Sequence, residues 1–130
     1  MASGAQDQPT VTAEDQQMIN KFARLHQNFV SLTDEMKVLL NDVQNLSEAS
    51  DEIMLLGEDE AVPLKMGTSF IHLPPDEAGT RLETMKAEAE EQAAMKKTEK
   101  DVIDIEMKRL KTTLYAKFGD RINLESESDD

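Results

Sequence analysis

The sequence contains no cysteine and no tryptophan, and only 4% of its residues are aromatic. The absence of cysteine excludes disulfides and thiolate metal sites, and it fits a reducing compartment. Aromatic side chains dominate many thick cores, so their scarcity argues against a large globular interior. The apolar residues are mainly aliphatic or methionine, which suits the narrow seam between long helices.

Positive charge is also scarce, and the net charge is -13. A nucleic-acid-binding protein needs clustered Lys and Arg to neutralise phosphates, so this balance argues against nucleic acid and against an anionic membrane surface. No apolar run approaches transmembrane length, and residues 1–9 lack the apolar core of a signal peptide. We therefore expect a cytoplasmic protein with neither nucleic acid nor membrane as partner.

Residues suited to catalysis or metal binding are few. His26 and His72 are the only histidines, and without cysteine a zinc site or activated nucleophile would depend on carboxylates to complete it. The carboxylates are spread along helix faces, and the glycines form no phosphate-binding loop. We expect no enzyme activity, no metal and no cofactor, and ordinary packing for both histidines.

One stretch dominates the chain. Over residues 18–53, apolar residues recur at alternating steps of four and three, interrupted only by Ser50. This spacing is the a/d repeat of a left-handed coiled coil, and it persists for about five heptads. The pattern predicts a helix over residues 12–56, with the Thr12 hydroxyl capping its start and Gly57 following its end. The predicted seam is Met18, Phe22, Leu25, Phe29, Leu32, Met36, Leu39, Val43, Leu46, Ser50 and Ile53.

Residues 61–73 have the character of a β-hairpin. Two short runs rich in β-forming residues flank Gly67 and Thr68, a plausible two-residue turn. A lone two-stranded hairpin is marginally stable in water, so its apolar side chains require strands from other chains. The predicted assembly residues are Val62, Leu64, Met66, Phe70 and Ile71.

A second helix is predicted over residues 75–118, between a proline pair and Gly119. Its seam is weak in the middle, because Gln92, Lys96 and Glu99 fall at expected apolar positions, and the following steps indicate a change of register. The first helix is acidic, whereas the second half of this helix is rich in lysine, which favours antiparallel pairing. Residues 1–10 and 125–130 are expected to be disordered tails, the second acidic, with Ser126 and Ser128 as phosphorylation candidates among its acidic residues.

The predicted fold is therefore mainly α, a long antiparallel two-helix coiled coil joined by one β-hairpin. This arrangement places both chain ends at one tip, where a thin helix pair leaves apolar surface exposed for other chains. The predicted binding residues at this tip are Ile19, Phe22, Tyr115, Phe118 and Ile122. The alternative is that they only close the seam, which fits Phe22 better than Ile19 or Tyr115, since the latter two lie off it.

Three stretches carry a family resemblance. Residues 11–17 (VTAEDQQ) with residues 19–23 (INKFA) form the first, and Gly67 with residues 69–71 (SFI) forms the second. Residues 114–119 (LYAKFG) with residues 122–125 (INLE) form the third. The chain resembles the prefoldin family, and within it the β-type subunits.

The resemblance implies a heterohexamer in which this chain joins five other prefoldin subunits, two α-type and three further β-type. Hairpins of the six subunits would build inter-subunit β-barrels. The coiled-coil tips would hold non-native clients such as actin and tubulin and pass them, without ATP, to the cytosolic chaperonin. The alternative that remains is an acidic structural coiled-coil tether or adaptor, which would pair with a partner helix through its seam.

Overall fold

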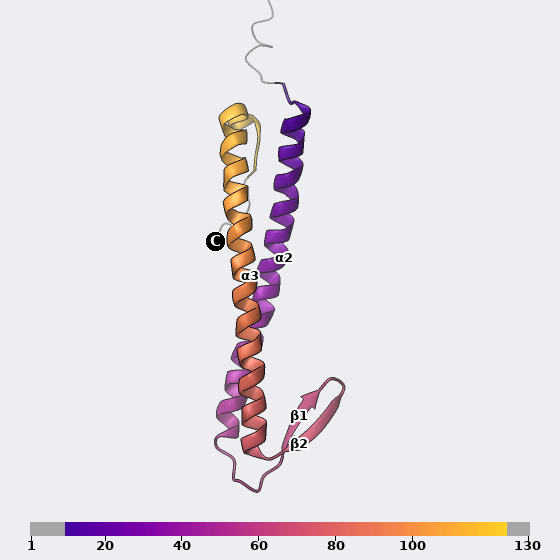
Figure 1. Ribbon diagram of the computed structural model, residues 1–130, viewed down its shortest axis with the longest axis vertical. Coiled ribbons are helices and arrows are strands. Elements are labelled where there is room, and N and C mark those ends of the chain that lie inside the picture. The colour runs from indigo at the N-terminus through magenta and orange to yellow at the C-terminus, as the bar shows by residue number, and fades with distance from the viewer. Residues whose placement is uncertain (1–9, 125–130) are drawn as a thin grey trace, which may run out of the picture. The chain divides into compact units, whose positions relative to one another are not determined.

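The computed structural model describes residues 10–124, apart from the side chain of Met66. Along the chain lie helix α2 (Ala13–Ile53), strands β1 (Val62–Met66) and β2 (Ser69–Leu73), helix α3 (Pro75–Phe118) and the short 3-10 helix η1 (Gly119–Arg121) (Figure 1). The expected fold of two long helices joined by one hairpin is confirmed. The predicted acidic tail with Ser126 and Ser128, and all but residue 10 of the predicted N-terminal tail, lie outside the described residues.

Helix α2 begins with a reciprocal cap. The backbone N–H of Asp15 donates to the Thr12 hydroxyl (3.0 Å), and the Thr12 N–H donates to the Asp15 carboxylate (2.9 Å). The helix ends at Ile53 and not at Leu56 as predicted. The N–H groups of Leu55 and Leu56 bond to carbonyls three residues back, so the last turn tightens and the α-helical pattern stops.

The predicted seam of α2 is confirmed. Every heptad position from Met18 to Ile53 is buried or half-buried. The one polar member, Ser50, donates its hydroxyl proton to the Glu83 carboxylate on α3 (3.0 Å). The interruption in the apolar repeat therefore has a polar partner on the facing helix.

The seam of α3 differs from the prediction in its middle. Gln92 and Glu99 are exposed, whereas Ala93 is buried and Lys100 is half-buried. Buried and half-buried positions step by four and three without interruption over residues 82–114, so the predicted change of register is wrong.

Lysine side chains make this regular seam possible, because their aliphatic stems can lie on apolar surface while the ammonium stays at the edge. The Lys96 ammonium lies 3.1 Å from the Glu35 carboxylate. The Lys100 ammonium lies 4.8 Å from the centre of the Phe29 ring. Both lysines are half-buried at heptad positions where an apolar residue would be usual.

The chain divides into two compact units. Unit 1 contains residues 1–34 and 97–130, so its described part pairs the first part of α2 with the last part of α3. Unit 2 contains residues 35–96, which hold the rest of both helices and the hairpin. The buried core of unit 1, here called the tip core, consists of Phe22, Met107, Leu110, Leu114, Phe118 and Leu124.

The hairpin in unit 2 is antiparallel, with Val62 opposite Leu73 and Leu64 opposite Ile71. Gly67 adopts a φ of 64° in the two-residue turn, a conformation that glycine reaches without strain. Within residues 10–124, these two strands are the whole sheet. Both of its edges therefore lack a strand partner inside the described chain.

Candidate functional site

The five predicted binding residues come together in unit 1 around the tip core. Phe22 and Phe118 are buried members of this core. Ile19, Tyr115 and Ile122 are half-buried and pack against it. The antiparallel arrangement thus gathers residues that lie about a hundred positions apart in sequence, but it covers the two phenylalanines more completely than a bare helix pair would.

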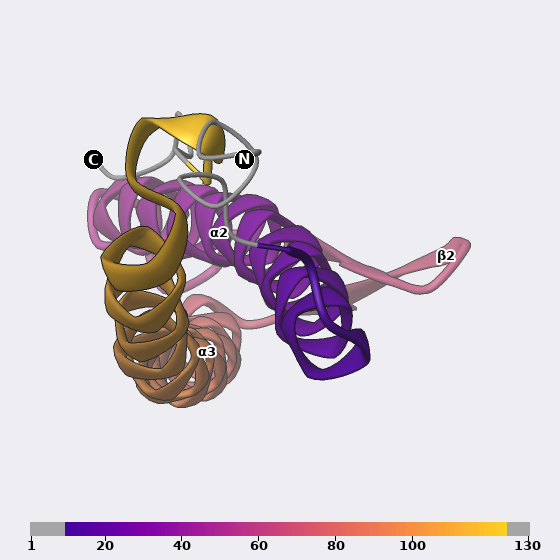
Figure 2. The same ribbon diagram turned by 90° about the horizontal axis from the view of Figure 1, so that it is seen from above.

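The cover comes from the segment after α3. Gly119 adopts a φ of 59°, and the chain turns through η1 and runs back beside the last turns of α3 (Figures 1 and 2). Leu124 then enters the tip core, and its N–H donates to the Tyr115 hydroxyl oxygen (2.8 Å). We call residues 119–124 the return segment. Sequence reasoning did not foresee its closing role, because Gly119 marks the end of a helix without giving the direction taken by the chain.

An ion pair between a buried carboxylate and an exposed ammonium joins the start of α2 to the end of α3. Asp15 is only 3% exposed, and its carboxylate pairs with the Lys117 ammonium. The hydrogen bond from Lys117, followed by those from Thr12, lowers the pKa of Asp15 below its ordinary value. Sequence reasoning counted both residues among the opposite charges of the two helices without pairing them, and the predicted Thr12 cap was the one local hint of a fixed carboxylate.

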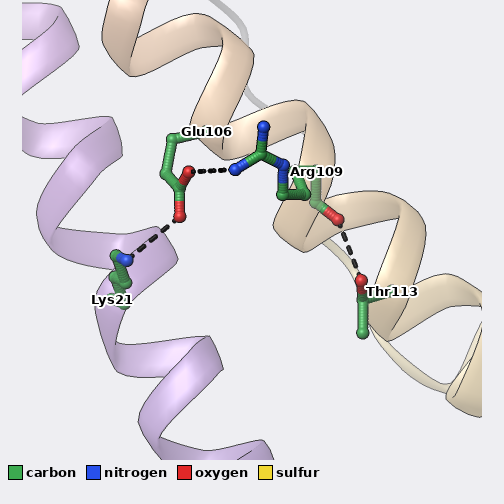
Figure 3. Close-up of polar contacts among 4 residues, drawn as sticks. All are labelled: Lys21, Glu106, Arg109 and Thr113. Atoms are coloured by element: carbon green, nitrogen blue, oxygen red, sulfur yellow. Dashed lines mark hydrogen bonds and ion pairs between the residues drawn. The ribbon is translucent and has the colours of Figure 1, made fainter.

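A second polar cluster lies further along the same helices (Figure 3). The Lys21 ammonium bonds to one oxygen of Glu106 (3.0 Å), and the Arg109 guanidinium bonds to the other (3.2 Å). The hydrogen bond from Lys21, its charge and then the charge of Arg109 lower the pKa of Glu106. These side chains reach solvent, so their ion pairs contribute little to the free energy of unfolding. Their opposite charges still favour this pairing of the two helices over others.

The hairpin register separates the predicted assembly residues. Directly opposed residues share a face, so Val62, Leu64 and Ile71 lie on one face of the hairpin. Phe70, opposite Lys65, lies on the other face and is 62% exposed, whereas Val62 and Leu64 are buried. Met66 pairs with Ser69 through its backbone. The hairpin projects away from the helices of unit 2 (Figures 1 and 2).

A further apolar surface in unit 2 was missed from the sequence. Met54 and Leu55, in the turn after α2, are strongly exposed. Met54 lines a cavity of about 910 Å³ together with Ile53, Pro74 and Pro75. Three consecutive apolar residues in the last turn of the predicted helix, at positions 54–56, were the available signal.

The described residues contain neither a candidate metal site nor a candidate membrane-spanning helix. Within residues 10–124, no group of three or more His, Cys, Asp or Glu side chains is placed to hold a metal ion. None of the helices in that range is both long and apolar enough to cross a membrane. His72 is exposed, and His26 is half-buried, with an Nε2 atom that has no hydrogen-bond partner among the described residues.

Comparison with known proteins places this geometry in a family. A family model described as "Prefoldin subunit" matches residues 16–121. A relative from Caenorhabditis briggsae, "Probable prefoldin subunit 4", is 42% identical over 122 residues, which cover 92% of this chain and 97% of the relative. The human "Prefoldin subunit 4" is 38% identical over 128 residues, covering 98% of this chain and 96% of that protein.

The chain belongs to the prefoldin family. Membership makes it a prefoldin co-chaperone subunit whose partners include other prefoldin subunits. The crystal structure of the prefoldin beta subunit from Thermococcus strain KS-1 is similar in fold, with a TM-score of 0.74 over 85% of this chain and 96% of that chain. Its sequence is 16% identical, so this likeness concerns the fold alone.

Proposed function

We propose that this chain is a β-type subunit of a cytoplasmic, heterohexameric prefoldin with two α-type and three further β-type partners. The assembly holds non-native proteins, actin and tubulin among them, at its coiled-coil tips without ATP and delivers them to the cytosolic chaperonin. The observation that carries the proposal is the incomplete hairpin, which presents two unpaired edges and an exposed Phe70 on a chain of this family.

Assembly through the hairpin follows from elementary energetics. A two-stranded sheet satisfies only part of its backbone hydrogen-bonding capacity and gains little from burial. Strands from neighbouring subunits can pair with both edges and cover Phe70, which would close the sheet into a barrel without free edges. The proposed assembly residues remain Val62, Leu64, Met66, Phe70 and Ile71, with Phe70 on the face that lacks cover.

Client holding at the tip rests on the apolar residues gathered there. Ile19, Tyr115 and Ile122 are half-buried around the buried Phe22 and Phe118, and none of the five is charged, which suits apolar segments of unfolded chains. No group in this cluster is placed for nucleotide hydrolysis, and the proposed holding activity requires only burial of apolar surface.

The test is a pull-down of the tagged chain from cytosolic extract, followed by native mass determination. The proposal predicts a six-chain assembly with five other short coiled-coil proteins, and loss of that assembly with Phe70→Asp. A homodimer, or one long partner chain, would overturn it. The control Val38→Asp changes an equally exposed residue on α2, outside the hairpin, and should preserve the assembly.

The tether alternative has less support. A tether would pair with a partner helix through the seam of α2, but α3 already covers that seam within the same chain. It would also make the hairpin dispensable, so deletion of residues 61–73 separates the two functions in the same pull-down.

A further inference from the structure

We propose that the return segment is an internal ligand of the tip. It occupies the groove that receives clients, so Ile122 belongs to the internal ligand, and the residues left to contact a client are Ile19, Phe22, Tyr115 and Phe118. The groove accepts an extended segment with apolar side chains two residues apart. The inference rests on the proposed function, since it specifies what the client-holding tip recognises and how it stays covered when no client is bound.

The backbone of the return segment supplies the first argument. Ile122 has φ -127° and ψ 144°, which is extended conformation. In an extended chain, residues two apart point to the same side. Ile122 and Leu124 accordingly both pack against the tip core, while Asn123 between them is exposed. The groove is therefore already filled by an apolar–polar–apolar segment, a pattern that unfolded chains contain in many places.

The polar contact supplies the second argument. The Tyr115 hydroxyl accepts a hydrogen bond from the backbone N–H of Leu124, and not from a side chain. Every residue except proline carries such a donor, so the same acceptor can serve a client of any sequence. Apolar contacts for alternate side chains, together with a main-chain hydrogen bond, give recognition that depends on pattern and tolerates sequence variation.

The third argument is that the return segment can be displaced from the tip core. A hollow of about 560 Å³ adjoins the segment and is lined by Tyr115, Gly119, Asp120, Ile122 and Asn123. Gly119 has a φ of 59°, and because glycine adopts positive and negative φ about equally readily, this residue can change conformation without steric strain. A short tether holds the segment at an effective concentration on the order of millimolar, enough to fill the groove against weak competitors and low enough for a multivalent client to displace it.

The experiment uses the complex reconstituted with its partner subunits. The probe is a fluorescein-labelled peptide, Arg-Ile-Asn-Leu-Glu-Ser, which copies residues 121–126, and its binding is followed by fluorescence anisotropy. The double variant Ile122→Ser with Leu124→Ser empties the groove. Because it removes the tethered competitor, we expect the peptide to bind about tenfold more tightly than to the unaltered complex. The matched control, Val102→Ser with Ile105→Ser, removes similar groups from an exposed face of α3 and should change nothing.

Two further variants and one further peptide separate recognition from general stickiness. Gly119→Ala adds a Cβ with no atom within 4 Å, so it strains only the backbone and should tighten peptide binding about fivefold by loosening the segment. Tyr115→Phe in the emptied complex should weaken peptide binding about fivefold, since the acceptor is lost. The peptide Arg-Asn-Ile-Leu-Glu-Ser places its apolar side chains on opposite sides and should bind the emptied complex at least about fivefold more weakly.

Circular dichroism melting shows whether each complex remains folded, and Gly119→Ala carries the test if the emptied variant does not. The proposal is overturned if a folded, loosened complex binds the peptide no better than the unaltered one, or if both peptides bind equally. Suppression of aggregation of a denatured client is measured in parallel. Suppression without selective peptide binding would refute the internal ligand and leave the proposed function standing, whereas selective peptide binding without suppression would refute the proposed function alone.

Discussion

Replacing Phe70 by alanine is expected to weaken incorporation of this subunit roughly a hundredfold. An aromatic side chain buries on the order of 200 Å² when fully covered. Phe70 is 62% exposed, so about 120 Å² remains for a partner to cover, worth about 3 kcal/mol at roughly 25 cal/mol per Å². Every 1.4 kcal/mol is a tenfold change in an equilibrium constant, so the association constant should fall by about two orders of magnitude.

The assay titrates the variant into the other subunits and follows assembly by sedimentation velocity. Val38→Ala is the matched control, because Val38 has the same exposed fraction of 62% but lies on α2, away from the hairpin. Thermal melting of the isolated variant checks that the change acts on assembly and not on folding, as the exposure of Phe70 predicts. If Phe70→Ala assembles at the same concentrations as the unaltered chain, the reasoning from exposed area is wrong.

Three other predictions concern the folded chain itself. Leu114 is fully buried, so Leu114→Ala should lower the free energy of unfolding, measured by urea titration, by about 2–5 kcal/mol. Leu114→Met keeps most of the side-chain volume and should cost less than about 1.5 kcal/mol, and equal losses would contradict the packing of the tip core. Asp15→Asn should destabilise the chain at pH 7, because the pKa of Asp15 is lowered in the folded state and its charged form therefore stabilises the fold above the ordinary pKa. This contribution is lost as pH falls through the folded-state pKa, so the melting curves of the two proteins should converge below about pH 4. A difference that does not depend on pH would exclude the ion pair as the cause. Amides over residues 93–100 should exchange with deuterium faster than those over residues 107–114, where the seam is filled by Leu and Met, and equal protection would show that the seam lysines pack as well as apolar residues.

Much of the fold could be predicted because the signals were local and repeated. The heptads of α2 survive over its whole length, and proline and glycine bracket α3 at its observed bounds. The register of α3 could not be read in its middle, where Ala93 and Lys100 are adjacent to the polar residues first assigned to the seam. A scheme that counts lysine as polar overlooks its apolar stem, and only the facing helix decides which of two neighbouring positions is covered.

The candidate sites were predicted less completely than the fold. Antiparallel pairing alone brings the five tip residues together, but their burial depends on a third segment whose path no local pattern specified. The separation of Phe70 from Ile71 was available, since adjacent residues of a strand must face opposite sides. The pairing of Asp15 with Lys117 needed the long-range geometry, because either residue has an adequate local role at its own helix end.

The two apolar surfaces differ in what covers them, and under the proposed function this difference fits two kinds of contact. Phe70 in unit 2 is exposed and has no covering segment in the described chain, so it remains unfavourably hydrated until another subunit binds. Phe22 and Phe118 in unit 1 are buried together with Leu124 of the chain's own return segment, so they need no partner to shield them from water. A surface that is costly to leave open favours a permanent interface, whereas one with its own displaceable cover favours capture and release. Under the proposed function, having the first kind on the hairpin and the second at the helix ends would let the same chain remain assembled while its clients exchange.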